Sequence, residues 1–202
     1  MNPYGLLRQL NYLKSTVHSN WGTGVRAWFY FIFYALFRVN RFVIMKNSIE
    51  NKDVAEIDLP GVTFDIPSLE EIAFLQSQEE LPREFYCDQY HKVSSCCVAK
   101  VDGELAYIHW VYLKGDFSRF LRIGSDSAEI NYVLTLPKYR GRRISTAAFN
   151  YSMLALKQKG VKNIFAVVHD KNIASIKSFE RAGFMEVGSI YSLCQFNRKV
   201  SV

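Results

Sequence analysis

An arginine-rich turn is the stretch of this sequence whose residue types are best suited to chemistry. Residues 136–149, LPKYRGRRISTAAF, place three arginines and a glycine between an apolar, strand-like run and a helix-like run. Because a helix begins with unpaired backbone N–H groups and a partial positive charge, a cationic turn at that point is suited to hold an anion, most often a phosphate. The residues that we expect around the anion are Arg140, Gly141, Arg142, Arg143, Ile144, Ser145 and Thr146.

The composition indicates a folded protein that is not a general nucleic-acid binder. The 202 residues are 49% hydrophobic and 22% charged, which suits one domain of ordinary size or one domain with an appendage. The net charge is +6, and the first 50 residues hold six Lys or Arg against one Glu, so +5 of it lies there. Since the rest of the chain is nearly neutral, we expect no nucleic-acid partner.

The four cysteines, Cys87, Cys96, Cys97 and Cys194, show no spacing that would suit zinc. No second ligand lies at helical or strand spacing from the histidines either, so we expect no metal site. We interpret the cysteines as reduced, mostly buried thiols of a cytoplasmic protein, and a catalytic cysteine is the less favoured alternative.

The amino-terminal segment is helical in pattern and aromatic in composition. Apolar residues recur at helical spacing over residues 6–17, and the run AWFYFIFYALF, residues 27–37, is flanked by arginines. Eleven apolar residues are too few to cross a bilayer, which takes about 20. The run suits a helix lying on an anionic membrane surface. The alternative is a helix packed on the domain or in a dimer interface. In either case we expect an amphipathic, aromatic helical segment over residues 1–38 and a main domain over residues 39–202.

The remaining patterns alternate between strands and helices. Ser68 followed by Glu71 is a capping-box signal, and Asp102 with Gly103 marks a hairpin turn. The order indicates an α/β fold with a mixed sheet covered by helices. The expected strands are 41–45, 93–101, 105–113, 127–136, 161–169 and one or two within 184–197, and the expected helices are 68–77, 79–92, 145–159 and 172–182.

Two motifs of this chain resemble those of the GNAT superfamily of acyl-CoA-dependent N-acyltransferases. The first is the turn, which is similar to the family's phrase P-x-Y-R-G-x-G through Pro137, Tyr139, Arg140 and Gly141, with Arg143 at the usual second glycine and Ser145 at the usual Gly or Ala. The second is NIASIKSFERAGF, in which Asn172, Phe179, Gly183 and Phe184 keep the spacing of a later family signature. The motifs lie within residues 127–184, and the order of elements matches over residues 41–195.

The resemblance implies a GNAT-like fold, a mixed and mostly antiparallel sheet flanked by helices, with acetyl-CoA or another acyl-CoA as donor. Glu129, eleven residues before Arg140, stands at the spacing of the general-base glutamate in several members. If this strand bends away from strand 161–169, its free backbone groups would pair with the pantetheine arm. The residues concerned are Val133, Leu134 and Thr135. Asn172 would contact the cofactor or cap its own helix.

Two departures from the family pattern concern the chemistry. Arg143 brings a side chain to a place where backbone usually approaches the pyrophosphate, so either the turn is wider or the guanidinium pairs with a phosphate. Phe179 replaces the tyrosine that often protonates the departing thiolate; the candidate replacements are Tyr132, Ser175 and His169. His109 is expected to line the acceptor cleft, with a core histidine as the alternative, and His169 to lie near the thioester.

The leading hypothesis is an N-acyltransferase that moves an acyl group, acetyl first among them, from acyl-CoA to a small-molecule amine by direct aminolysis. The basic, hydrophobic amino-terminal segment favours a cytoplasmic enzyme attached peripherally to the inner membrane face, acting on an amino sugar or another glycan or lipid precursor. One alternative is a degenerate GNAT domain that binds acyl-CoA or a partner without turnover. Another is an acyl-carrier-protein-dependent synthase. The oligomeric state stays open.

Overall fold

The computed structural model describes residues 22–29, 32, 39–55, 57–78, 80–193 and 198–202. The chain forms two compact units, residues 1–40 with 191–197 and residues 41–190 with 198–202. In the first unit residues 25–29 are helical, with Ala27 buried and Val25 and Phe29 exposed. The rest of the segment predicted over residues 1–38 lies almost wholly outside the described residues, as does Cys194. Within the described ranges, no helix combines the length and apolarity needed to cross a bilayer.

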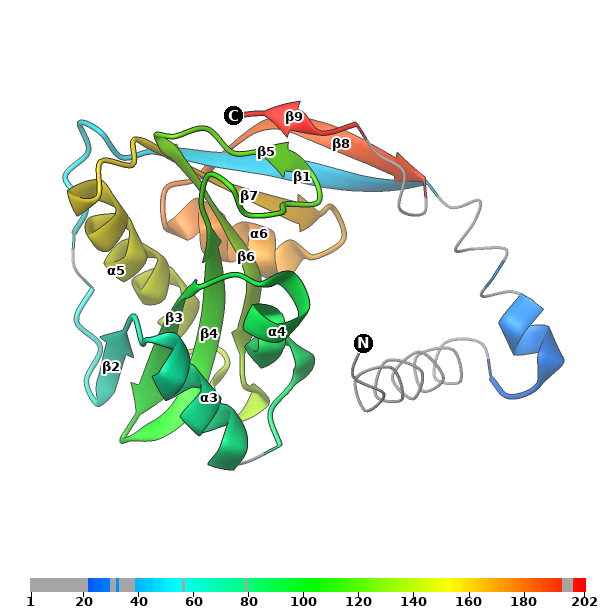
Figure 1. Ribbon diagram of the computed structural model, residues 1–202, viewed down its shortest axis with the longest axis horizontal. Coiled ribbons are helices and arrows are strands. Elements are labelled where there is room, and N and C mark those ends of the chain that lie inside the picture. The colour runs from blue at the N-terminus through cyan, green and yellow to red at the C-terminus, as the bar shows by residue number, and fades with distance from the viewer. Residues whose placement is uncertain (1–21, 30–31, 33–38, 56, 79, 194–197) are drawn as a thin grey trace. The chain divides into compact units, whose positions relative to one another are not determined.

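A seven-stranded sheet forms the main unit, in the order β2-β3-β4-β6-β7-β1-β8 (Figure 1). Among the described pairings of this sheet only β6 with β7 is parallel, and β1–β7, β2–β3, β3–β4 and β4–β6 are antiparallel. The sheet is therefore mixed and mostly antiparallel, which confirms the predicted fold class. Its strands are β1 Val39–Ser48, β2 Val62–Asp65, β3 Ser95–Val101, β4 Glu104–Tyr112, β6 Ser127–Thr135, β7 Asn163–His169 and β8 Met185–Leu193.

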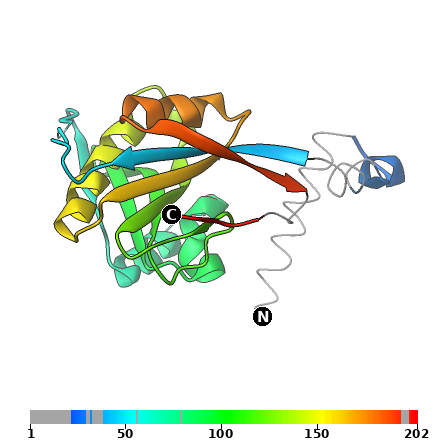
Figure 2. The ribbon, with the colours of Figure 1, turned by 90° about the horizontal axis from the view of Figure 1, so that it is seen from above.

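Helices cover both faces of this sheet, and Figure 2 shows α6 on one side and α3 and α4 on the other. Alternate residues of β4 enter different cores: Tyr107 packs with α5 and α6, whereas Ile108 and Trp110 pack with the elements between residues 69 and 93. The helical elements are α3 Leu69–Gln78, the 3-10 helix η1 Arg83–Tyr86, α4 Cys87–His91, the 3-10 helix η2 Pro137–Tyr139, α5 Ile144–Gln158 and α6 Ile173–Arg181.

Helix ends follow the signals in the sequence. The capping box at α3 is confirmed, because the Ser68 N–H donates to Glu71 Oε2 at 2.7 Å and the Glu71 N–H donates to Ser68 Oγ at 3.3 Å. Gly160 follows α5 with a φ of +80°, and Gly183 follows α6 with a φ of +84°. Glycine adopts this left-handed conformation at little cost, so both helices stop where predicted.

Three elements differ from the sequence-based expectation. Residues 62–65, where no strand was expected, form the edge strand β2 beside β3. The helix expected over residues 79–92 is divided into η1 and the single turn α4, which ends at Lys92 with a φ of +56°. A small parallel pair, β5 Leu121–Arg122 with β9 Val200–Ser201, was not expected at all. Its strands have two residues each, too few for a periodic pattern.

Candidate active site

The central feature of the site is the separation of β6 from β7. The two strands pair in parallel at three positions, the last being Glu129 opposite Phe165, although β6 continues to Thr135 and β7 to His169. Beyond this point the edge of β6 that faces β7 has lost its sheet neighbour. Backbone N–H and C=O groups on such an edge are open to an extended ligand.

A β-bulge in β6 accompanies the separation. The pairing with β4 shifts by one residue between Trp110 opposite Asn131 and Ile108 opposite Leu134. The extra residue lies at Tyr132, whose φ is +50°, a left-handed conformation that costs a side-chain-bearing residue about 1–2 kcal/mol. Strained backbone of this kind is concentrated at functional sites. The bulge re-aims the end of β6, which carries Val133 to Thr135.

The arginine-rich turn leads directly into α5. The first helical hydrogen bond runs from the Ala147 N–H to the Arg143 carbonyl at 3.2 Å, so the N–H groups of residues 144–146 precede the helix ladder. No side chain caps this end, and the first turn holds no acidic residue. A 15-residue helix thus begins uncapped beside three arginines, which is the arrangement that an anion stabilises.

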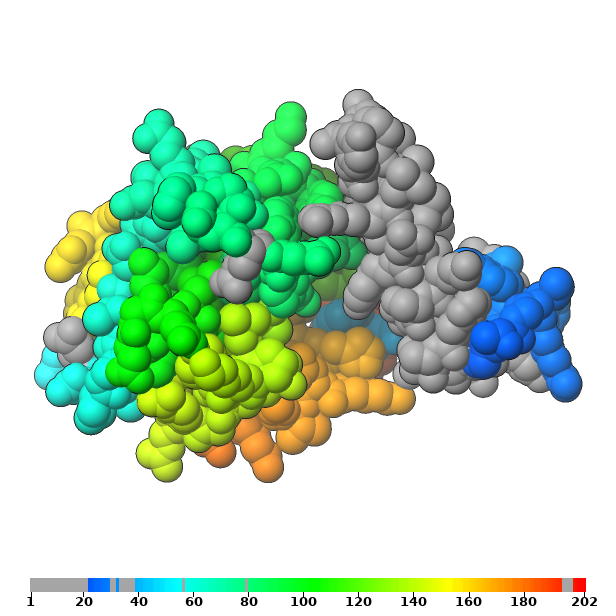
Figure 3. Space-filling model, turned by 90° about the horizontal axis from the view of Figure 1, so that it is seen from below, coloured from blue at the N-terminus to red at the C-terminus, as the bar shows by residue number. Residues whose placement is uncertain are grey.

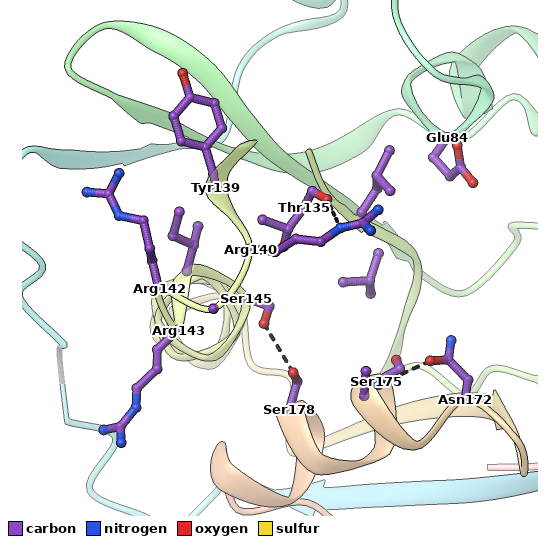
Figure 4. Close-up of a pocket in the computed structure, with 15 residues that line it drawn as sticks. Glu84, Thr135, Tyr139, Arg140, Arg142, Arg143, Ser145, Asn172, Ser175 and Ser178 are labelled. Atoms are coloured by element: carbon purple, nitrogen blue, oxygen red, sulfur yellow. Dashed lines mark hydrogen bonds between the residues drawn. The ribbon is translucent and has the colours of Figure 1, made fainter. Parts of the chain in front are cut away.

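Arg143 occupies the position of the usual glycine without blocking the turn. Its φ is +60°, in the left-handed region that glycine favours, so the backbone follows the path of a glycine. In Figure 4 the side chains of Arg142 and Arg143 extend in opposite directions from the turn, both away from Ser145, whereas that of Arg140 reaches toward Thr135. Arg140 Nε donates to the Thr135 carbonyl at 3.2 Å. That carbonyl is therefore occupied rather than free for a cofactor amide.

A pocket of about 540 Å³ connects the end of β6 with this turn (Figure 4). Ten of the residues expected to bind the cofactor line it, and the eleventh, Thr146, is buried and does not. The ten are Val133, Leu134, Thr135, Arg140, Gly141, Arg142, Arg143, Ile144, Ser145 and Asn172.

Helix α6 forms the opposite wall of the pocket through Asn172, Ser175 and Ser178. Asn172 Oδ1 accepts from the Ser175 N–H at 3.2 Å, so this side chain caps α6 and lines the pocket as well. The Ser145 and Ser178 hydroxyls are 3.3 Å apart and join α5 to α6. Figure 3 shows the yellow-green residues around 140 adjoining the orange residues of α6 at the surface.

Glu129 lies outside the lining of the pocket, four residues before Val133 on the same strand. Its side chain is fully buried, and Oε1 accepts from Asn131 Nδ2 at 3.1 Å. Burial raises the pKa of Glu129 to about 7, although Ser118, Lys199 and Asn131 each act to lower it. A carboxyl group that titrates near neutrality is suited to take a proton from an amine.

Phe179 and His109, both considered for the chemistry on sequence grounds, belong to the core. Phe179 stacks on Phe149 with ring centroids 4.3 Å apart and is 1% exposed. His109 is fully buried, with Nδ1 2.8 Å from the Tyr107 hydroxyl and Nε2 3.0 Å from the Ser152 hydroxyl. Burial lowers the pKa of His109 to about 3, so the ring is neutral. The alternative of a core histidine describes it, and we assign it no contact with substrate.

His169 ends β7, on the strand that separates from β6, but it does not line the pocket. Its Nδ1 is 3.1 Å from Asp170 Oδ1 and accepts from the Lys171 N–H at 3.1 Å. The ring packs edge-on against Phe42. Among the three candidates for protonating a thiolate, only Ser175 lines the pocket; Tyr132 and His169 do not.

Sequence reasoning missed two residues near this site. Glu84 of η1 lines the pocket opposite Arg142, and its backbone carbonyl accepts from Trp110 Nε1 at 2.8 Å. Tyr112 of β4 lies directly opposite Glu129 in the sheet. No spacing rule points to either residue, because the position of Glu84 depends on how η1 packs and that of Tyr112 on strand register.

The three described cysteines are buried, and burial raises the pKa of Cys97 to about 12.

The family of this chain follows from a comparison with protein-family models. The family model of the GNAT acetyltransferase family matches residues 64–184, more than half of the chain. The chain belongs to the GNAT acetyltransferase family. That range contains both motifs, the separation of β6 and β7, and the pocket. No curated protein matches the sequence.

Solved GNAT structures share the fold at low identity. A GNAT protein from Novosphingobium aromaticivorans is 18% identical with a TM-score of 0.56, over 76% of this chain and 63% of that one. A GCN5-related N-acetyltransferase from Sphaerobacter thermophilus is 14% identical with a TM-score of 0.56, over 87% of this chain and 58% of that one. The glucosamine N-acetyltransferase region of a fungal multi-domain β-N-acetylglucosaminidase is 17% identical with a TM-score of 0.58, over 83% and 23%. The chain thus spans less than two thirds of each.

Proposed function

We propose that this GNAT protein transfers an acyl group from acyl-CoA to an amine by direct aminolysis. The observation that carries the proposal is the continuity between an uncapped, arginine-flanked helix start and the open edge of β6, both in one pocket, with a buried carboxyl group where β6 leaves β7. An elongated donor with phosphates at one end and a thioester at the other matches this order of groups.

The donor would be held at two places. The N–H groups of residues 141–146, with Arg140, would bind the pyrophosphate, because that end of α5 has neither a cap nor an acidic residue. The free edge of β6 at Val133 and Leu134 would pair with the amides of the pantetheine arm, and one of its N–H groups would stabilise the oxyanion. The Thr135 carbonyl would instead keep Arg140 oriented.

Glu129 would act as the general base. An ammonium must lose a proton before its nitrogen can attack a thioester, and a carboxylate whose pKa is raised to about 7 can accept that proton at physiological pH. Full burial of Glu129 favours transfer through a water molecule over direct contact. The departing thiolate would accept a hydrogen bond from Ser175, the one candidate that lines the pocket.

For the acceptor we propose a small amine, with an amino sugar first among the candidates. One structurally similar region is a glucosamine N-acetyltransferase, which supplies the choice of glucosamine as the first acceptor to test. The exposed Val25, Phe29 and Ile32 beside Arg26 would attach the protein to an anionic membrane surface. Cosedimentation with anionic and neutral vesicles tests this attachment. Binding to neither would contradict it.

The direct test of the function is an acyl-transfer assay. Purified protein is incubated with acetyl-CoA or a long-chain acyl-CoA and a panel of amines that includes glucosamine, and both the free thiol and the acylated amine are measured. The proposal predicts equal amounts of the two products, and turnover that is lost in Glu129→Gln while acyl-CoA still binds. Binding of acyl-CoA without turnover by the parent protein would identify a non-catalytic domain instead.

A further inference from the structure

Tyr112 and Glu129 are neighbours across the β4–β6 ladder. They face each other directly in the antiparallel register, where opposite Cβ atoms lie about 5 Å apart on one face of the sheet. Tyr112 packs in the core beneath η1 and α4, so Glu129 points to the same side. The two residues are 1% and 0% exposed.

Each of these side chains buries a polar atom that has no hydrogen-bond partner among the residues that the structure describes: the Tyr112 hydroxyl and Glu129 Oε2. Burying an unpaired polar group costs about 1–3 kcal/mol, so native proteins seldom keep one without a reason. Here a donor and an acceptor are left over on two residues that face each other in the ladder, while Glu129 Oε1 accepts from Asn131 and the Ser118 side chain also hydrogen-bonds the carboxyl group. One small ligand with several hydrogen bonds would satisfy both atoms.

The position of Tyr112 and Glu129 in the sheet connects the two residues with the proposed acyl transfer. Glu129 is the last residue of β6 that pairs with β7, so the pair lies where the strands separate. Tyr132, the bulge residue, stacks on Tyr112 at 6.5 Å between centroids, and His91 of α4 stacks on Tyr132 at 4.9 Å. This aromatic stack holds the Tyr112 ring and covers it on the side of α4.

We propose that Tyr112 is a positioning residue for acyl transfer, whose hydroxyl and Glu129 Oε2 together hold the water molecule that carries the proton away from the acceptor amine. This inference rests on the proposed function and adds to it the residue that orients the relay. The water accepts from the Tyr112 hydroxyl, donates to Oε2 and accepts from the substrate ammonium. These three hydrogen bonds are the usual number for a buried water molecule.

The proton balance of the step is complete. The water gives one proton to the Glu129 carboxylate and takes one from the ammonium, which leaves a neutral amine, a carboxylic acid and an intact water molecule. The amine nitrogen then forms its bond to the thioester carbon, and the carbon–sulfur bond breaks as coenzyme A leaves as a thiolate. The amide nitrogen releases its second proton to the thiolate, and Glu129 returns its proton to solvent.

Other charged and titratable groups act on this pair or on Tyr132 beside it. They are Cys87 of α4, Arg83 of η1, Tyr132 of β6, Asp116 and Arg119 of the segment after β4, and Lys199 near β9. Burial is the main cause of the raised pKa of both Tyr112 and Glu129, and the charge of Glu129 raises the pKa of Tyr112 further. The tyrosine therefore stays protonated and remains a hydrogen-bond donor around neutral pH.

The test compares Tyr112→Phe with the wild type in two measurements. In acyl transfer from acetyl-CoA, the variant is expected to lose about 10- to 100-fold in kcat. Phenylalanine cannot donate the hydrogen bond of the Tyr112 hydroxyl, so the ionised Glu129 carboxylate loses stabilisation and its pKa rises. The acid limb of the kcat profile should therefore move to higher pH. Infrared titration of the Glu129 carboxyl, identified by its loss in Glu129→Gln, should show the same upward shift with no substrate present. Tyr107→Phe is the matched control: the same change on the same strand, with its hydroxyl bonded to His109 on the opposite face.

The outcomes separate this inference from the proposed function. Unchanged kcat and an unchanged carboxyl titration in Tyr112→Phe would overturn the role of Tyr112, as would an equal shift in Tyr107→Phe. A wild-type protein that binds no acyl-CoA in calorimetry would instead overturn the proposed function, whatever the infrared titration gives. Thermal unfolding of both variants shows whether a loss of turnover is a loss of fold.

Discussion

Glu129 and Phe165 form the last pair that joins β6 to β7, and beyond this pair β6 runs on without a neighbour on that side. In the proposed function Glu129 is the base at this last pair, and the phosphate-binding turn follows the end of β6, so the unpaired edge of β6 separates the two. This order would set which end of an acyl-CoA donor binds at which end of the pocket.

Glu129→Gln should increase stability while it removes turnover. The pKa of Glu129 is raised to about 7 from its usual value near 4.5, so the native state binds more protons than the unfolded state in this range. Stability is therefore lost as pH rises from 4.5 through 7, by about 3 kcal/mol once ionisation is complete. Denaturant unfolding at pH 5 and pH 8 checks this. A variant whose difference from the wild type is the same at both pH values would contradict it.

The kcat profile of the wild type should have an acid limb near pH 7, because Glu129 must be ionised to accept a proton. Turnover should fall about tenfold for each pH unit below the limb. The measurement uses saturating acetyl-CoA and acceptor, so that the limb reports the bound enzyme. A flat profile between pH 5 and pH 8 would exclude Glu129 as the base.

His109 should make the protein sensitive to acid through a different group. Burial lowers its pKa to about 3, whereas the unfolded value is near 6.5, so stability is lost as pH falls through that interval. The wild type should lose about 2 kcal/mol more than His109→Gln between pH 8 and pH 5. Unfolding of the two proteins at both pH values isolates this contribution from that of Glu129. Equal losses would mean that His109 is not a buried neutral ring.

Arg143→Gly should stabilise the fold by about 1 kcal/mol, since glycine removes the cost of a side chain at φ +60°. Arg143→Ala keeps a Cβ in the same conformation and removes the same charge, so it serves as the matched control and should not be stabilised. Because the side chain points away from the pocket wall formed by Ser145, acyl-CoA binding should survive in both variants. A large loss of affinity in both would show that the guanidinium itself contacts the donor.

Features that depend on a few neighbouring residues could be predicted from the sequence. The Ser68 and Glu71 box, the glycines at 160 and 183, and the turn from Arg140 to Ser145 each depend on a few neighbouring residues, and each lies where the pattern predicted. The order of elements predicted a mixed sheet, and the resemblance to the GNAT family implied that it is mostly antiparallel.

What the sequence did not disclose depends on contacts across the fold. Tyr112 meets Glu129 only because a bulge at Tyr132 shifts the register of β4 and β6, and a tyrosine in a left-handed conformation carries no mark in the sequence. The alternation of side chains along β4 is compatible with a cleft position for His109. However, α5 packs over this strand face, and its Ser152 hydroxyl contacts His109 Nε2 in the core. Glu84 reaches the pocket because the expected helix 79–92 breaks into η1 and α4.

The most direct test of the central claim is isothermal titration of the protein with acetyl-CoA and with a long-chain acyl-CoA. Arg140→Ala is compared with Arg181→Ala, which removes the same charge from the end of α6, outside the pocket lining. The account predicts binding of at least one donor, weakened about tenfold or more by Arg140→Ala and little changed by Arg181→Ala. No binding of either donor to the wild type, or equal weakening by both substitutions, would contradict it.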